Sequence, residues 1–273
     1  MRRTGLRLFA ASAALFLGSA LAAGAGQSVV ESAWTSQPPA IDGLRNDWQG
    51  TALTDWKKDA VAFAFRNDGE TLYVLLVIQD PKYRSSIEGT GVTLYFDAQG
   101  AKAKDHGILF KKLRLDPEAY IAYLEKQGPV ADEDRAEIRR KAGFFLYHHQ
   151  VLDRKGKPAE AVSEALSRPA VFKYAADGRA LVFEFSVPLL GESDLAAGVG
   201  SGPGGAVSVG FAWGGETEEM RKAAAKRMRE QANFTNEEAD EDVNPTIVSS
   251  TGSGPAPKKY QFWTSVKLAG NSR

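Results

Sequence analysis

The stretch from residue 59 to residue 81 constrains the fold of this chain more than any other. Its first part, residues 60–66, alternates small and large side chains, and the large ones share one face of a strand: Val61, Phe63 and Phe65. Residues 67–69 read Asn-Asp-Gly, tolerate positive φ and predict a hairpin turn. The second part, residues 71–78, is apolar on both faces. Such a strand belongs in the middle of a sheet, with other structure packed on each side.

The N-terminus has the features of a secretory signal peptide. Arg2, Arg3 and Arg7 are basic, an apolar run covers residues 8–23, and Ala20-Leu21-Ala22 fits a cleavage site. A membrane-spanning helix needs a longer apolar run. We therefore predict a signal peptide over residues 1–25, an exported protein, periplasmic or extracellular, and no stable membrane span after cleavage. An uncleaved anchor is the alternative.

Charge and cysteine content narrow the function classes. The chain has 34 Lys+Arg and 34 Asp+Glu, so removal of the three N-terminal arginines leaves 31 basic residues and a net charge near −3. This balance indicates no nucleic-acid partner. The chain has no cysteine, so its stability in an oxidising compartment must come from a packed core. Residues 26–273 are predicted to form a single domain.

Several short motifs in the first half resemble a known family. Residues 39–43 read Pro-Ala-Ile-Asp-Gly, and Asp47-Trp48 follow; the hairpin then ends at Asp80-Pro81. Together they resemble the opening of the family-9 carbohydrate-binding modules and their relatives in the DOMON-like superfamily. Later segments resemble further strands of that family: residues 91–97, 181–189, 207–213 and 260–268.

The resemblance implies an all-β fold, an antiparallel β-sandwich of jelly-roll type. The residues themselves agree, because many short alternating segments are separated by Gly, Pro, Asn and Asp turns. Two stretches depart from the family pattern. Residues 116–142 are rich in helix formers and predict short helices, started by Pro117 and capped by Asp132, in an insertion packed against one edge of the sandwich. Residues 216–242 predict a charged helical or mobile segment in which Met220, Ala224 and Met228 share a face.

Tryptophans are the first candidates for ligand contact, because sugars stack their apolar faces on flat rings. Trp213 precedes two glycines at a strand end and Trp56 lies in a polar stretch, so these two are the leading candidates, with packing at the sheet edge as the alternative. Trp48 follows the Ile-Asp-Gly turn; we expect a structural role, with ligand contact as the alternative. Trp263 falls inside an alternating strand, in the core or on the sheet surface.

Acidic residues give a candidate calcium site. Asp240, Asp242 and Asn244 have the D-x-D-x-N spacing that begins a calcium loop, although Pro245 and Thr251 stand where the loop needs Gly and Glu. At the strand ends, Asp42, Asp80 and Asp97 fit turn caps, with calcium as the alternative. The spacing of His106, His148 and His149 resembles no zinc site.

These observations lead to three functional hypotheses. The sequence contains no recognisable catalytic motif, so the first is an exported, non-catalytic carbohydrate-binding module. The second is a b-type haem electron-transfer subunit, as in some DOMON-like relatives; its axial ligands would come from Met220, Met228, the histidines or lysines, and a c-type haem is excluded without cysteine. The third is a structural or partner-binding envelope protein that uses residues 216–242.

Overall fold

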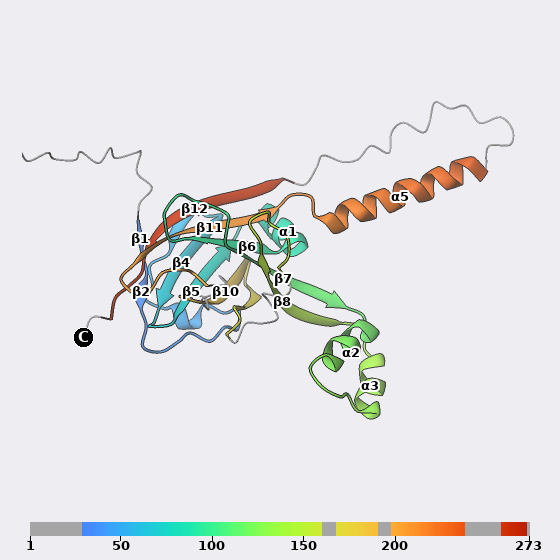
Figure 1. Cartoon of the computed structure of the whole chain (residues 1–273), viewed down its shortest axis with the longest axis horizontal. Helices are drawn as coiled ribbons and strands as arrows, with labels where there is room; N and C mark the ends of the chain where they lie inside the picture. The colour runs from blue at the N-terminus through green and yellow to red at the C-terminus, as the bar shows by residue number, and fades with distance from the viewer. Residues whose placement is uncertain (1–28, 160–167, 191–197, 238–257, 272–273) are drawn as a thin grey trace, which may run out of the picture.

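The computed structural model (Figure 1) describes residues 29–159, 168–190, 198–237 and 258–271. Within these residues, two six-stranded sheets pack against each other, which confirms the predicted β-sandwich with short helices. In chain order the elements are β1 (Val30–Glu31), β2 (Ala33–Trp34), the 3-10 helix η1 (Asn46–Trp48), β3 (Thr54–Lys57), β4 (Val61–Asn67), β5 (Thr71–Ile78), α1 (Pro81–Thr90), β6 (Val92–Asp97), β7 (Gly107–Leu115), α2 (Pro117–Glu125), α3 (Asp132–Arg139), β8 (Phe144–Leu152), β9 (Val171–Asp177), β10 (Ala180–Pro188), β11 (Ala206–Gly214), α5 (Glu218–Glu237) and β12 (Lys259–Lys267).

Sheet A has the strand order β1-β12-β11-β6-β7-β8, and sheet B has the order β2-β4-β5-β10-β9, with β3 paired to β4. Two edge pairs, β1 with β12 and β2 with β4, are parallel rather than antiparallel. The segment from Val30 to Trp34 is therefore divided between the two sheets. Ser32 lies at the division, where its N–H donates to Lys267 O in sheet A and its hydroxyl to Asn67 Oδ1 in sheet B.

Strand β5 occupies the interior position that its sequence predicts. It pairs with β4 on one side and with β10 on the other. One face contributes to the core between the sheets: Leu72, Val74, Leu76 and Ile78. The opposite face, with Tyr73, Leu75 and Val77, belongs to a second apolar cluster on the outside of sheet B. A strand apolar on both faces is stable here because both faces are covered.

The hairpin between β4 and β5 forms as predicted, but by a different local mechanism. Asn67, Asp68 and Gly69 all have negative or extended φ, so the turn does not use the left-handed region. Instead the Asp68 carboxylate accepts hydrogen bonds from the backbone N–H groups of Glu70 and Thr71, at 2.8 and 2.7 Å. A side-chain cap of this kind replaces the positive-φ turn that the sequence suggested.

The insertion near residues 116–142 stands away from the sandwich. Beyond Phe110, β7 no longer pairs with β6, and β7 and β8 continue as a two-stranded ribbon with α2 and α3 at its end (Figure 1). Tyr120 of α2 stacks on Phe144 at 4.0 Å between ring centroids. The insertion therefore packs on its own ribbon and not against the sandwich edge. Asp132 is the first residue of α3 and does not cap it.

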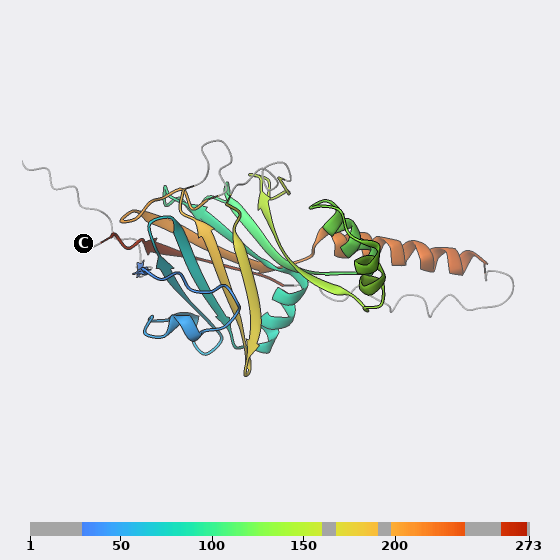
Figure 2. The ribbon, with the colours of Figure 1, turned by 90° about the horizontal axis from the view of Figure 1, so that it is seen from below.

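Helices α1 and α5 lie at the same end of the sandwich as this ribbon. Helix α1, which the sequence reading missed, begins where Asp80 caps Lys82 N and Pro81 takes the first helical position. Helix α5 falls inside the predicted charged segment and extends outward from the body (Figures 1 and 2). Among the residues that the structure describes, no helix is long and apolar enough to span a bilayer.

Candidate functional site

Trp56 and Trp213, the leading sequence candidates, meet in one aromatic cluster at the α1 end of the core. Their ring centroids are 5.6 Å apart, and Trp56 also stacks on Phe262 at 4.6 Å. Trp213 is 3% exposed because it follows the inward alternation of β11. Trp56 is half-buried against the core because it lies on the same side of β3 as Thr54, whose partner Phe63 belongs to that core. The geometry is that of edge packing, the alternative that the sequence left open.

Trp48 lies on the outside of sheet B and is 4% exposed. Its indole N–H donates to Glu184 Oε1 at 2.7 Å, and Glu184 Oε2 accepts from the N–H groups of Asp42 and Gly43 at 3.0 and 2.7 Å. One buried carboxylate of β10 thus fixes the segment Ile41–Trp48 across the sheet. This arrangement agrees with the expected structural role of Trp48 and leaves no free ring face for a ligand.

The acidic residues at strand ends act as turn caps. Asp42 accepts from Leu44 N, and Asp97 accepts from the N–H groups of Gln99 and Ala103, each at 2.8 or 2.9 Å. In the described part of the chain, no cluster of three or more His, Cys, Asp or Glu side chains is placed to hold a metal ion. Asp240, Asp242 and Asn244, the candidate calcium ligands, lie outside the described residues.

The candidate haem ligands are dispersed. Met220 and Met228 lie on the exposed side of α5, and His106 is exposed in the loop before β7. His148 and His149 are successive residues of β8 and point to opposite faces of the sheet. Only His149 is on the inner face, opposite Phe110. Within the described ranges, no two of these His or Met side chains face each other across the core.

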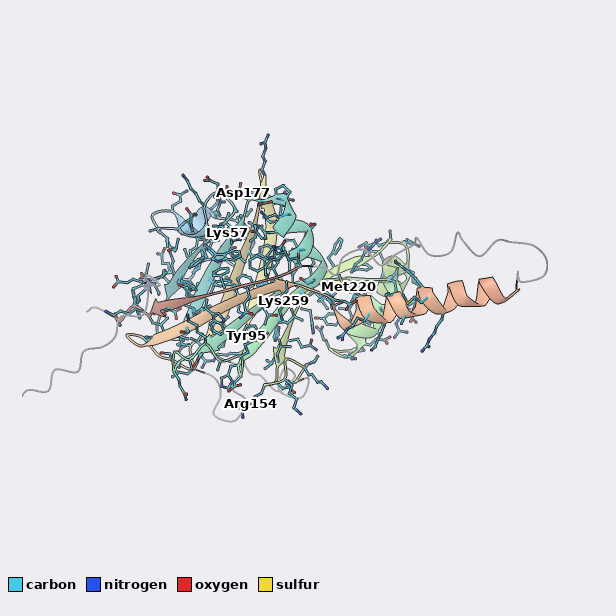
Figure 3. The ribbon with its side chains drawn as sticks, turned by 90° about the horizontal axis from the view of Figure 1, so that it is seen from above. Lys57, Tyr95, Arg154, Asp177, Met220 and Lys259 are labelled. Atoms are coloured by element: carbon cyan, nitrogen blue, oxygen red, sulfur yellow. The ribbon has the colours of Figure 1, made fainter. Side chains whose placement is uncertain are left out.

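The outer face of sheet A carries a different pair of aromatic residues. The strand register places Trp263 of β12, Gly210 of β11, Tyr95 of β6 and Gly107 of β7 in one row across the sheet. The rings of Tyr95 and Trp263 are near-parallel, with 6.1 Å between centroids and 28° between planes. Figure 3 looks onto these strands and shows Tyr95 and Lys259 on them.

The two glycines in this row explain why the rings lie flat. A Cβ atom built on Gly210 would stand 2.8 Å from Trp263 Cε2, and one on Gly107 would stand 2.8 Å from Tyr95 Cδ1. Each ring therefore occupies the space that a side chain on the neighbouring strand would take. We call the surface formed by Tyr95 and Trp263 the aromatic platform. Trp263 is half-buried, whereas Tyr95 is largely covered.

Polar groups surround the aromatic platform. Lys104, from the loop between β6 and β7, donates to Gln261 Oε1 at 2.8 Å and lies 5.7 Å from the Tyr95 ring centroid. Gln261 and Lys259 precede Trp263 on the same side of β12, and Thr93 precedes Tyr95 on the same side of β6. The arrangement combines apolar rings with amide, hydroxyl and ammonium groups, as in sites that bind small polar ligands.

Sequence reasoning placed Trp263 either in the core or on the sheet surface and did not single out Tyr95. One signal was available, since Gly210 interrupts a strand whose other residues alternate in the usual way, and Gly107 is the first residue of β7. A glycine inside a strand marks a place where something approaches the backbone closely. Which ring approaches it depends on the strand order, and that is not visible in a single sequence.

Comparison with protein-family models and with curated protein sequences gives no match. Among solved structures, the chain is similar to a family 9 carbohydrate-binding module from Caldicellulosiruptor kristjanssonii in complex with cellotriose, with 11% identity and a TM-score of 0.41 over 90% of this chain and 95% of that one. It is also similar to such a module from the same organism in complex with glucose, with 12% identity and a TM-score of 0.33 over 90% and 97% of the two chains. These values describe a likeness of fold, and the sugars are ligands of those modules.

Proposed function

We propose that this protein binds carbohydrate, without catalysis, on the outer face of sheet A. The observation that carries the proposal is the aromatic platform, in which the Tyr95 and Trp263 rings lie flat over Gly107 and Gly210. A flat ring on a sheet surface offers its face to the apolar side of a pyranose ring. Gln261 and Thr93 are placed around it to bond hydroxyl groups.

We also propose that the protein is exported. The basic start, short apolar run and small-residue cleavage pattern support a secretory signal peptide over residues 1–25. A polysaccharide ligand would then be met in the periplasm or outside the cell. The proposal assigns the chain a binding role because the groups at the aromatic platform are two rings, an amide, a hydroxyl and ammonium groups.

The test is a titration of the mature protein, from Gly26 onward, with neutral and acidic oligosaccharides, followed by tryptophan fluorescence and calorimetry. We expect saturable binding that is lost in Trp263→Ala. Trp34→Ala is the matched control, because Trp34 is a half-buried tryptophan of β2 in sheet B. Circular dichroism checks that both variants fold. Equal loss of binding in the two variants, or retained binding in Trp263→Ala, contradicts the proposal.

A second candidate function is protein binding through α5, and a separate observation favours it. Residues 220–229 of this helix are exposed along their whole length, with Met228 at 65%. Helices of this kind gain most of their stability from packing, so a partner that covers α5 would protect it. Limited proteolysis of the purified protein, alone and in envelope extract, tests this candidate. Equal cleavage of residues 216–242 in both conditions argues against it.

A further inference from the structure

The aromatic platform is bordered by positive charge from separate elements. Lys104 comes from the loop between β6 and β7 and lies over Tyr95. Lys259 is on β12, two residues before Gln261, and so points to the same side of the sheet. Lys111 is on β7 in register with His148, on the outer side that it shares with Leu109. The ammonium groups of Lys104, Lys111 and Lys259 therefore all lie on the outer side of sheet A that carries the aromatic platform.

On the strands that carry the aromatic platform, negative charge does not balance these lysines; in the adjoining loops, Asp105 next to Lys104 pairs with Arg154, and Glu216 follows Gly215 beside Lys259. Along the outward sides of β12, β11, β6 and β7, Asp97 is the only acidic residue within the described ranges. Its carboxylate is occupied by the backbone N–H groups of Gln99 and Ala103. Burial acts to raise the pKa of Asp97, but these hydrogen bonds outweigh it and lower the pKa, so the group stays a charged turn cap. Among the ion pairs of the described residues, none includes Lys104, Lys111 or Lys259.

The two lysines nearest the rings also repel each other. Burial lowers the pKa of Lys104, and the positive charge of Lys259 lowers it further. Lys104 is held in this position by the neutral amide of Gln261 and by the Tyr95 ring. An anion placed between the two ammonium groups would relieve the repulsion and form charge-assisted hydrogen bonds.

We propose that the aromatic platform recognises an acidic oligosaccharide, one whose uronic-acid carboxylate lies between Lys104 and Lys259 while its pyranose ring stacks on Trp263. This inference rests on the proposed carbohydrate binding and names the class of sugar. A carboxylate attached to a pyranose ring brings a flat apolar face and a negative charge together, which are the two features that this surface complements.

The experiment compares oligosaccharides of uronic acids, derived from pectin, alginate and glucuronoxylan, with their carboxyl-reduced neutral counterparts. The reduced sugars keep the ring configuration and lose only the charge. We expect at least one acid to bind about tenfold more tightly than its reduced form. The difference should shrink between about 0.02 M and 0.3 M salt, because exposed charges are screened.

Two variants separate this inference from the proposed function. Lys104→Gln with Lys259→Gln should abolish the preference for the acid and retain binding of the reduced sugar, whereas Trp263→Ala should lose both. Lys58→Gln with Lys126→Gln removes two exposed lysines elsewhere and is the matched control for net charge. Equal affinity for acids and reduced sugars in the unchanged protein overturns the acidic specificity but not carbohydrate binding. Absence of binding to every sugar overturns both.

Discussion

The two sheets of this sandwich both carry a tryptophan on the outer face, and the two residues have opposite environments. On sheet B, Trp48 is sealed by the segment that contains it and donates to the buried carboxylate of Glu184. On sheet A, Trp263 lies flat across Gly210 and is half-buried. The comparison shows that the exposure of each tryptophan depends on the group that lies opposite its indole ring. A buried acceptor draws an indole inward, whereas an opposing glycine lets it lie on the surface.

Removal of the Glu184 carboxylate should produce the largest effect. In Glu184→Ala, the Trp48 Nε1–H and the N–H groups of Asp42 and Gly43 lose their acceptor in a buried site. The free energy of unfolding should fall by about 3 kcal/mol, measured by urea denaturation. Glu70→Ala removes an exposed carboxylate that pairs with Arg168, and the change should stay within about 0.5 kcal/mol. Equal losses of unfolding free energy in the two variants would contradict the role of Glu184 in holding the segment Ile41–Trp48 on sheet B.

The same substitution on the two faces should give different results. Trp48→Phe keeps an aromatic ring but removes the donor to Glu184 Oε1, and should cost about 2 kcal/mol of unfolding free energy. Trp263→Phe alters a half-buried ring on the surface of sheet A and should cost under about 1 kcal/mol. Urea denaturation of both variants measures the two losses of unfolding free energy. A larger loss in Trp263→Phe than in Trp48→Phe would contradict the contrast between the two tryptophans.

A smaller effect should appear in the pH dependence of stability. Burial raises the pKa of Glu184; the hydrogen bonds from Trp48, Gly43 and Asp42 N–H oppose this, and contact with the Asp42 carboxyl adds to it. The folded protein then binds more protons at this site than the unfolded chain does. The contribution to stability is complete below the unfolded pKa of about 4.3 and is lost as pH rises through the folded pKa.

Glu184→Gln tests this pH dependence because it cannot titrate. Urea denaturation at several pH values should show the unchanged protein losing stability relative to Glu184→Gln as pH rises above about 4.3. Lys173, in register with Glu184 on β9, and Asp42 are the charged neighbours to be kept constant. Parallel stability curves would show that Glu184 has the same pKa in the folded and unfolded states.

The sequence was sufficient for the features that depend on local pattern. The alternation at residues 60–66 and the two-sided apolar run at residues 71–78 predict β4 and β5, and the second of these also predicts the central place of β5 in sheet B. The Ile-Asp-Gly and Asp-Trp motifs predict a structural Trp48. What the motifs do not reveal is Glu184, which lies 136 residues from Trp48 and holds that segment in place.

The aromatic residues of the candidate site could not be predicted for a related physical reason. Trp56 lies on the inward side of β3, two residues after Thr54, and Trp213 is buried because α1 and Tyr260 cover that end of the core. Tyr95 and Trp263 become neighbours only when β11 separates their strands and offers Gly210 between them. Strand order decides which aromatic residue meets a glycine, and residue type alone does not contain that information.

Gly210→Ala should have a small effect on stability and still abolish the difference between the two faces. Gly210 does not use positive φ, so the backbone accepts alanine. The new methyl group would stand 2.8 to 2.9 Å from three atoms of the Trp263 ring, which must lift from the sheet. Because that ring is half-buried, lifting it should cost about 1 kcal/mol of unfolding free energy. The platform, however, would no longer be flat, and sugar affinity should fall about tenfold.

Gly128→Ala is the matched control, since Gly128 also lacks positive φ and has nothing within 4 Å of the added atom. If Gly210→Ala binds sugar as the unchanged protein does, a flat Trp263 is not what the ligand recognises, and the contrast between the two sheets has no part in function.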